Sequence, residues 1–283
     1  MSEADFRSLT MALSGLGYEA DRNVKYFLRE LGSGRRLAAM AGDLVMSDLD
    51  VIVAASTGEA QAIQRLTTTI PIVMAFGLAP VELGLVKSLA RPEGNVTGTT
   101  GAPIELAGKA VEVLRDTLPQ LKHLAALVNG TRLGSLFEME TRRAGDALGI
   151  AVSVWKVQST LELSRTFASL QRARPDAISV GHGLASSLRR IVQFANASRI
   201  PAMYASVPAV TAMGGLMAYA VNYSVLMKRT ASIVDMVLHG SKPADIPIEQ
   251  ANRFVLAINR RAGNAIGVIF PPAVALRAEI IVE

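Results

Sequence analysis

Short apolar runs alternate along the whole chain with longer segments whose apolar residues recur at helical spacing. The apolar runs predict β-strands at residues 23–29, 50–55, 70–76, 123–128, 151–156, 177–180, 201–204, 216–219 and 254–258. The segments between them predict helices at residues 6–16, 35–46, 59–66, 80–89, 104–117, 135–148, 161–172, 186–198, 207–213, 224–238 and 260–265. Alternating helices and nearly continuous apolar strands are typical of parallel sheets covered on both faces, so the predicted fold class is α/β.

The pattern restarts after Pro119, and the two parts of the series are similar strand–helix runs. We therefore expect two doubly wound parallel-sheet lobes, a class that binds ligands at the carboxyl ends of its strands. Such a lobe starts with a strand, whereas this chain opens on the helix at Phe6, and residues 1–5 cannot form a buried strand. Either the first strand of lobe one lies upstream or its sheet is incomplete, and we favour the first alternative.

Composition narrows the function classes. Of the 283 residues 50% are hydrophobic, but no apolar run reaches the roughly 18 residues of a membrane span. The chain has no cysteine, which excludes disulfides and thiolate chemistry. The opening residues MSEADFRSLT lack the basic and apolar regions of a signal peptide. The net charge of +5 raises the question of nucleic acid, but the basic residues are dispersed pairs on predicted helices, so we expect no nucleic-acid partner.

The candidate chemistry is concentrated in a predicted strand–helix–strand unit over residues 50–76. Ser56, Thr57 and Gly58 follow its first strand and precede a helix, where hydroxyl and backbone N–H groups could hold a carboxylate. A simple helix N-cap explains the same residues. Phe76 and Gly77 end the neighbouring strand, so the aromatic ring either stacks on a ligand or packs in the core. The turn matches neither a P-loop nor a GxGxxG fingerprint.

Catalytic and metal-binding patterns are missing from the sequence. The three histidines are His123, His182 and His239, and only His182 follows a strand at a plausible ligand-binding edge. No HExxH or similar metal-ligand spacing occurs, and no GxSxG motif marks a nucleophile. We therefore expect no enzyme, no catalytic residue, no metal and no cofactor.

Several segments in a fixed order carry a more specific signal. They include SLARPEGNVTG at residues 88–98, GGLMAY at residues 214–219, and PIEQ at 247–250 followed by FVLAIN at 254–259. As a set, and with the flanking segments over residues 6–283, they resemble the ABC-transporter solute-binding proteins of the tryptophan- and tyrosine-binding type. Members of that family have the periplasmic-binding-protein class I fold.

The resemblance implies an extracytoplasmic, periplasmic receptor that closes by a hinge on a small carboxylate or amino-acid-like ligand. It implies a monomer that transiently meets an ABC permease in the membrane. Lobe one is expected to hold residues 1–118 and 221–248, and lobe two residues 119–220 and 249–283. The implied ligand-binding residues are Ser56, Thr57, Gly58, Phe76, Gly77, Thr97, Asn129, His182, Tyr204, Tyr219 and Asn222.

Two departures from the family pattern bear on the ligand. Family members usually carry Asp-Pro after the strand that corresponds to residues 70–76, where this chain has Gly77-Leu78-Ala79-Pro80. They often carry an acidic residue after the strand at 177–180, where this chain has Gly181-His182-Gly183. A buried ligand ammonium needs a paired anion, and both of these acidic positions are missing here. An uncharged or anionic ligand is therefore favoured over a zwitterionic amino acid. The alternative function is a cytosolic ligand-sensing regulatory domain of the same fold.

Overall fold

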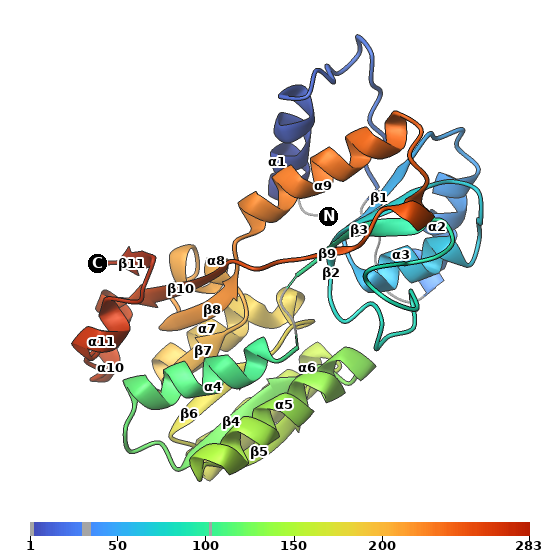
Figure 1. The fold of residues 1–283 in the computed structure, drawn as a ribbon. Coiled ribbons are helices and arrows are strands. Elements are labelled where there is room, and N and C mark those ends of the chain that lie inside the picture. Colours follow the sequence, from blue (N-terminus) through green and yellow to red (C-terminus); the bar gives the residue numbers. More distant parts are fainter. Residues whose placement is uncertain (1–2, 30–34, 102–103) are drawn as a thin grey trace. The chain divides into compact units, whose positions relative to one another are not determined.

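The structure is a computed structural model that describes residues 3–29, 35–101 and 104–283 (Figure 1). Its contacts divide the chain into two compact units. Unit 1 comprises Met1–Pro103 and Asn222–Asn252, and unit 2 comprises Ile104–Val221 and Arg253–Glu283. The chain therefore passes from one unit to the other three times. The helix at residues 106–117, expected in the first lobe, belongs to unit 2.

Unit 1 is built on a four-stranded sheet in the order β1-β2-β3-β9, and all of its strand pairs are parallel. The strands are β1 (Ile52–Ala54), β2 (Ile72–Gly77), β3 (Val96–Thr100) and β9 (Glu249–Gln250). Every residue of β3 is buried, and β2 is buried at all positions except Phe76. The sheet is therefore covered on both faces, as its nearly continuous apolar sequence predicts.

Helices lie on both faces of this sheet (Figure 1). The helices are α1 (Glu3–Ser14), α2 (Arg35–Val45), α3 (Thr57–Gln64) and α9 (Tyr223–Leu238). Leu9 and Leu13 of α1 pack with α9 against Val73 and Ala75 of β2. Side chains of α2 and α3 pack on the other face, against Ile72 and Met74 among others. Successive residues of β2 thus face opposite helix layers, as the alternation of side chains along a strand requires.

Unit 2 contains a seven-stranded sheet in the order β11-β10-β8-β7-β6-β4-β5. The strands are β4 (His123–Val128), β5 (Ala151–Lys156), β6 (Ala177–Val180), β7 (Ala202–Tyr204), β8 (Met217–Val221), β10 (Phe254–Asn259) and β11 (Ile280–Val282). The strands from β5 to β8 are parallel, whereas β10 runs antiparallel to β8. The order reverses between β4 and β6, which makes this position the topological switch point of the sheet.

Two apolar clusters fill the two faces of this second sheet. The helices of unit 2 are α4 (Leu106–Thr117), α5 (Arg132–Leu148), α6 (Thr160–Ala173), α7 (Leu188–Ala197), α8 (Val207–Thr211), α10 (Arg260–Ile266) and α11 (Pro272–Ala275). One face packs against α6, α7 and α8 through residues such as Leu163 and Ile191. The other packs against α4 and the C-terminal helices through residues such as Leu114 and Val274. The expected doubly wound α/β architecture is confirmed.

Two predicted elements differ in the structure. Residues 25–29 are extended but belong to no strand, although a strand was predicted at 23–29. Residues 80–89 form turns instead of a helix, and Gly84 in their midst has a φ of +76° that a helix cannot contain. The structure also has a short strand, β9, at Glu249–Gln250, where the sequence predicted none. The antiparallel β10 also departs from the purely parallel sheets that the pattern predicted.

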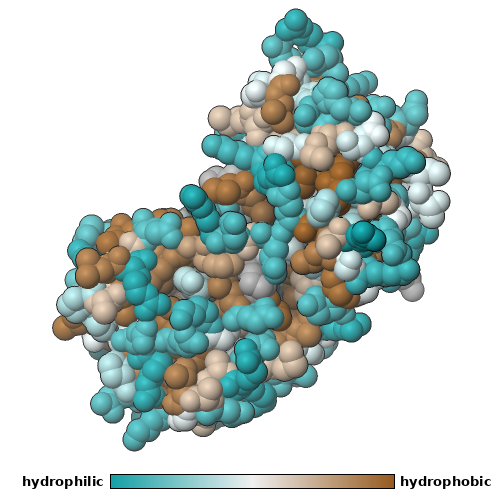
Figure 2. All heavy atoms as spheres, in the orientation of Figure 1, coloured by the Kyte–Doolittle hydropathy of each residue, from teal (hydrophilic) through white to brown (hydrophobic). Residues whose placement is uncertain are grey.

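Hydrophilic residues cover most of the face seen in Figure 2, with apolar residues scattered among them. Ile269 and Leu276 of unit 2 are the most exposed of the large hydrophobic residues described, at 85% and 87%. Among the described residues, no helix is both long and apolar enough to pass through a membrane.

Candidate functional site

The first candidate edge lies at the carboxyl ends of β1 and β2 in unit 1. Ser56 is extended and forms the N-cap of α3, where its hydroxyl oxygen accepts a hydrogen bond from the backbone N–H of Glu59 at 3.2 Å. The Glu59 carboxylate returns to accept from the backbone N–H of Ala55 at 2.8 Å. The arrangement resembles a capping box, except that Glu59 accepts from the residue before the N-cap instead of from the N-cap itself. The N-cap explanation of Ser56 is therefore confirmed, and the cap uses the Glu59 amide but not the amides of Thr57 and Gly58.

Thr57 and Gly58 are the first two residues of α3, and their backbone N–H groups have no partner in the described part of the chain. Gly58 is exposed, whereas the Thr57 side chain is only 3% exposed. The Thr57 hydroxyl donates to the carbonyl of Leu78 at 2.8 Å and accepts from its N–H at 2.9 Å. That hydroxyl is thus occupied in tying α3 to the end of β2. A ligand at this turn would meet backbone N–H groups and the positive end of the helix dipole.

Other predicted residues of unit 1 lie at different depths. Phe76 is half-buried at the end of β2, and its ring meets that of Tyr223 edge-on at 5.0 Å between centroids. Asn222 is the N-cap of α9 and accepts from the N–H of Val225. Thr97 is fully buried, and its hydroxyl donates to the carbonyl of Ile246 at 2.8 Å. The Thr97 side chain therefore has a structural partner already.

The second candidate edge lies at the switch point of unit 2, where β4 and β6 end side by side. Asn129 follows β4, and His182 follows β6 in the sequence Gly181-His182-Gly183. A Cβ atom on Gly183 would lie 2.0 Å from the Asn129 side-chain nitrogen, so these two loops are in contact. The φ of +83° at Gly183 favours glycine as well. The loop is thereby shaped to bring Asn129 and His182 to the crevice at which doubly wound sheets bind ligands.

His182 is half-buried, and desolvation lowers the pKa of its imidazole to about 4. The ring is therefore neutral at physiological pH, with one nitrogen that donates and one that accepts a hydrogen bond. Asn129 also offers both kinds of group, and it accepts a hydrogen bond from the Thr131 hydroxyl at 2.7 Å. This edge consequently presents neutral polar groups and no carboxylate among the residues just named.

Tyr204 ends β7, next to β6 in the same sheet, and is only 1% exposed. Its hydroxyl is buried without a hydrogen-bond partner among the described residues, and burial raises the pKa of the phenol above its ordinary value. A buried hydroxyl without a hydrogen-bond partner lowers the stability of the folded state. The Tyr204 hydroxyl is therefore the group of unit 2, among the predicted residues, that most needs a further hydrogen bond. Tyr219 of β8 is half-buried, and its ring lies 6.3 Å from that of Phe254.

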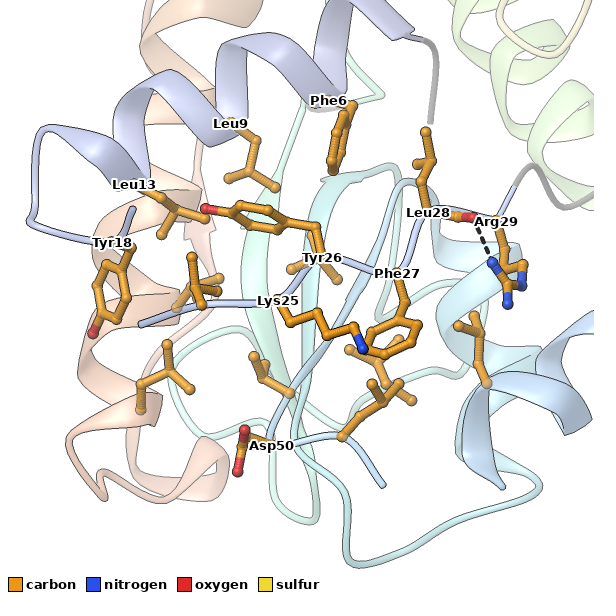
Figure 3. Close-up of a pocket in the computed structure, with 18 of the residues that line it drawn as sticks. Phe6, Leu9, Leu13, Tyr18, Lys25, Tyr26, Phe27, Leu28, Arg29 and Asp50 are labelled. Atoms are coloured by element: carbon orange, nitrogen blue, oxygen red, sulfur yellow. Dashed lines mark hydrogen bonds between the residues drawn. The ribbon is translucent and has the colours of Figure 1, made fainter. Parts of the chain in front are cut away.

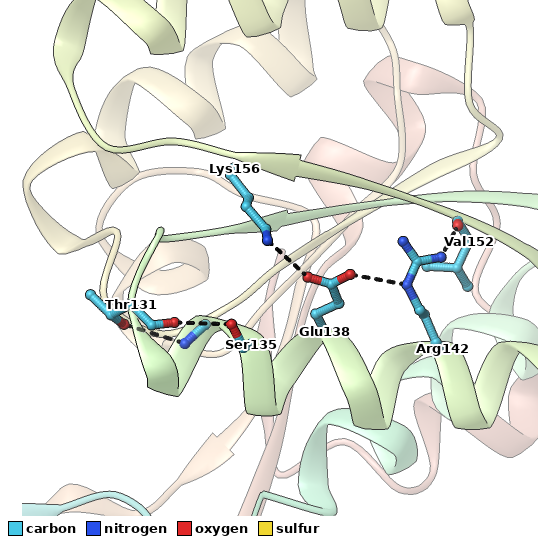
Figure 4. A network of polar contacts seen from close by, with 7 residues as sticks. Thr131, Ser135, Glu138, Arg142, Val152 and Lys156 are labelled. Carbon is cyan, nitrogen blue, oxygen red and sulfur yellow. Dashed lines mark hydrogen bonds and ion pairs between the residues drawn. The ribbon is translucent and has the colours of Figure 1, made fainter. Parts of the chain in front are cut away.

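One group of residues near Asn129 escaped the sequence analysis (Figure 4). Thr131 is the N-cap of α5, because its hydroxyl accepts from the N–H of Gly134 at 3.3 Å. Further along α5, Glu138 pairs with Arg142 at 3.1 Å and with Lys156 of β5 at 3.7 Å. A threonine soon after a buried strand is a recognisable N-cap signal. The cap and the ion pairs hold α5 against the strands, and thereby fix the loop that carries Asn129.

Within the described parts of the chain, no group of three or more His, Cys, Asp or Glu side chains is arranged to hold a metal ion. Most of the predicted residues lie at or just after the carboxyl ends of their strands, whereas Tyr219 lies in the middle of β8 and the side chains of Thr97 and Tyr204 are enclosed within their own units.

A sequence profile of the family described as ABC transporter substrate binding protein matches residues 3–282. The chain belongs to this family. The tyrosine-binding protein of Clostridioides difficile (strain R20291) is 28% identical to this substrate-binding protein over 252 residues, which cover 88% of this chain and 72% of that protein. The recognised resemblance is therefore confirmed.

Solved structures agree with the family assignment. An ABC domain from Streptococcus pneumonia in complex with L-Trp is 27% identical, with a TM-score of 0.88 over 98% of this chain and 95% of that chain. A conserved domain protein from Vibrio cholerae O1 biovar El Tor is 26% identical, with a TM-score of 0.90 over 99% and 94% of the two chains. The family consists of substrate-binding proteins that work with ABC transporters, and the alternative of a cytosolic sensor finds no support here.

Proposed function

We propose that this substrate-binding protein is the extracytoplasmic receptor of an ABC importer and binds a small carboxylate or amino-acid-like ligand without catalysing a reaction. The observation that carries the proposal is the family match over residues 3–282. Two relatives add the ligand class, since one is named a tyrosine-binding protein and the other was solved with L-Trp. The ligand is an amino acid, or an aromatic or aliphatic acid of similar size.

The carboxylate of the ligand would be held at the N-terminus of α3. The free N–H groups of Thr57 and Gly58 and the Ser56 hydroxyl are the donors at this turn. Hydrogen bonds between N–H groups and a carboxylate are charge-assisted, and the helix dipole adds to them. Glu59 does not oppose an anion strongly, because its carboxylate is turned back to the N–H of Ala55.

The remainder of the ligand would be recognised by neutral groups of unit 2, chiefly Asn129, His182 and the Tyr204 hydroxyl. None of these can neutralise a ligand ammonium by charge, and the acidic residue often found after β6 in the family is replaced by Gly181-His182-Gly183. A ligand whose amino group is absent or masked therefore suits this edge better than it would suit relatives with that acid.

Binding is expected to bring the two units together about the three points at which the chain crosses between them, which precede Ile104, Asn222 and Arg253. A ligand that contacts both units only in a closed state shifts the population toward that state. The closed monomer would then meet the membrane permease.

The experiment is a thermal-shift screen of free amino acids, their N-acetyl forms and aromatic acids, followed by small-angle scattering with each hit. A ligand at 100 times its Kd should stabilise the protein by about 2.7 kcal/mol and reduce the radius of gyration. Asn129→Ala should weaken binding about tenfold or more by removing one buried hydrogen bond. Ser135→Ala, an exposed change one turn into α5, is the matched control. Equal affinities of the two variants would remove Asn129 from the site.

A further inference from the structure

A groove of about 550 Å³ lies within unit 1, separate from the residues assigned to the ligand above (Figure 3). Leu9 and Leu13 of α1 point into it from one side. Val234 of α9, which packs in the same cluster, also lines it. Leu44 of α2 and Ile63 of α3 line it from the other side. The groove is therefore apolar toward both helix layers of the unit, which is the environment of a strand inside a covered sheet.

One border of the groove is the free edge of β1. Among the described residues β1 pairs only with β2, and the N–H of Ile52 points to that partner, because it donates to the carbonyl of Pro71 at 2.9 Å. Since backbone groups alternate sides along a strand, those of Val51 and Val53 point away from β2. Both residues line the groove, and their backbone N–H groups have no partner among the described residues.

The opposite border is the extended segment 24–28. No backbone N–H of residues 25–28 finds an acceptor in the described part of the chain. Val24 and Tyr26 line the groove together with Lys25 and Phe27. The ring of Tyr26 packs edge-on against Phe6 at 5.7 Å, and the buried Tyr26 hydroxyl is a further group without a partner among the described residues. Unpaired backbone therefore borders the groove on two sides.

Val51 and Val53 are half-buried, and the unpaired backbone groups of a free sheet edge are a template for a further strand, so this border favours an occupant with backbone groups of its own. Lys25, Phe27 and Leu28 on the other border are exposed, so their backbone groups pair with water until a strand lies beside them. A small molecule could fill the volume, because ligand pockets span about 300–1,000 Å³. It could not, however, supply alternating donors and acceptors to Val51 and Val53 while contacting both helix layers. We propose that the groove binds an extended apolar peptide segment as an added β-strand, parallel to β1 and between β1 and residues 24–28.

The structure also sets the sequence and direction of this segment. Its successive side chains would face Leu9 and Leu13 on one side and Leu44 and Ile63 on the other, so every position must be apolar. The sheet of unit 1 is entirely parallel, and a strand that continues it in parallel ends at the edge that carries Ser56. The residues that follow the added strand would then lie beside the N-terminus of α3.

The test joins the pentapeptide Val-Ile-Val-Ile-Val to Met1 of the full chain through a flexible Gly/Ser linker. The matched control carries Ser-Asn-Ser-Asn-Ser on the same linker, since alternating polar residues cannot enter the groove. The apolar extension should raise Tm by about 3 °C or more over the control. It should also slow amide hydrogen exchange at Val51 and Val53 and across residues 25–28 by about tenfold, because these groups gain partners.

A second variant separates strand pairing from apolar contact. Val53→Pro removes the donor that faces the groove and leaves the ladder with β2 intact, as proline at an edge strand allows. The stabilisation by the apolar extension should be lost in this background. The same Tm and exchange rates in both extended proteins would overturn the proposal. Stabilisation that persists in V53P, or that leaves the exchange of Val51 and Val53 unchanged, would overturn it too. Ligand affinity is measured in a separate experiment. A failure of the proposed receptor function can therefore be told apart from a failure of strand addition in the groove.

Discussion

The neutral imidazole of His182 makes the stability of the protein depend on pH in a direction that can be calculated. Unfolding returns the ring to water, where its pKa is about 6.5, whereas desolvation holds the pKa at about 4 in the folded state. Unfolding therefore takes up a proton between these values. The stability contributed at this position is unchanged above pH 6.5 and is lost progressively as the pH falls toward 4.

The size of this loss follows from the two pKa values. Between pH 7.5 and pH 5 the difference in proton binding lowers the free energy of unfolding by about 2 kcal/mol. The sign of the change does not depend on the exact folded value, because any pKa below that of the free imidazole makes unfolding take up a proton. Replacing His182 by Gln keeps a neutral polar side chain and removes the titration. Between pH 7.5 and pH 5 the free energy of unfolding should therefore fall by about 2 kcal/mol less in the variant than in the wild type.

The assay is urea unfolding of wild type and His182→Gln at pH 7.5, 6 and 5, with the difference between the two proteins taken at each pH. The difference in the free energy of unfolding between wild type and His182→Gln should change by about 2 kcal/mol between pH 7.5 and pH 5. Parallel pH profiles for wild type and His182→Gln would refute the burial argument, and with it the description of His182 as a neutral ligand-facing group.

Three further substitutions test other contacts. Tyr204→Phe removes a buried hydroxyl without a partner and should raise stability by about 1 kcal/mol in thermal or urea unfolding; if ligand affinity falls at the same time, the hydroxyl serves the ligand. Gly98→Ala should lower the free energy of unfolding by about 3 kcal/mol or more, because φ is +131° and the new Cβ would lie 2.1 Å from a backbone oxygen of β2. Its control, Gly240→Ala, has a φ of +92° but open space around the new Cβ, so it should lower the free energy of unfolding clearly less. Thr57→Val breaks both hydrogen bonds to Leu78 and should cost about 2 kcal/mol by urea unfolding; a loss below 0.5 kcal/mol, roughly the lower limit for one bond, would contradict the assigned role.

The prediction from sequence was most accurate for elements whose local apolar pattern agrees with their place in the sheet. The strands at His123–Val128, Ala151–Lys156 and Ala177–Val180 have the predicted bounds, because each is a run rich in apolar residues between two amphipathic helices. Residues 23–29 have a comparable pattern, but a strand also needs a neighbour to pair with. The described chain supplies none beside them, so the segment is extended without being a strand.

Strand direction and the details of the site depend on contacts that local patterns do not contain. β10 runs antiparallel to β8 although its sequence resembles that of the parallel strands, because direction is decided by the connection between them. The N-cap at Ser56 could be predicted from its spacing to Glu59. The enclosure of Thr97 and the unpaired hydroxyl of Tyr204 could not, since both result from residues far away in the sequence.

The most direct test of the receptor function is isothermal titration of the wild-type protein with matched acids and amides. The pairs are L-Trp and L-Tyr with their primary amides, and an aromatic acid with its amide. At least one acid should bind with a Kd in the micromolar range or below, and its amide about 100-fold more weakly, because the amide lacks the charge that the α3 N-terminus recognises. Equal affinity for an acid and its amide, or no binding of any acid by protein shown to be folded, would contradict this account of the site.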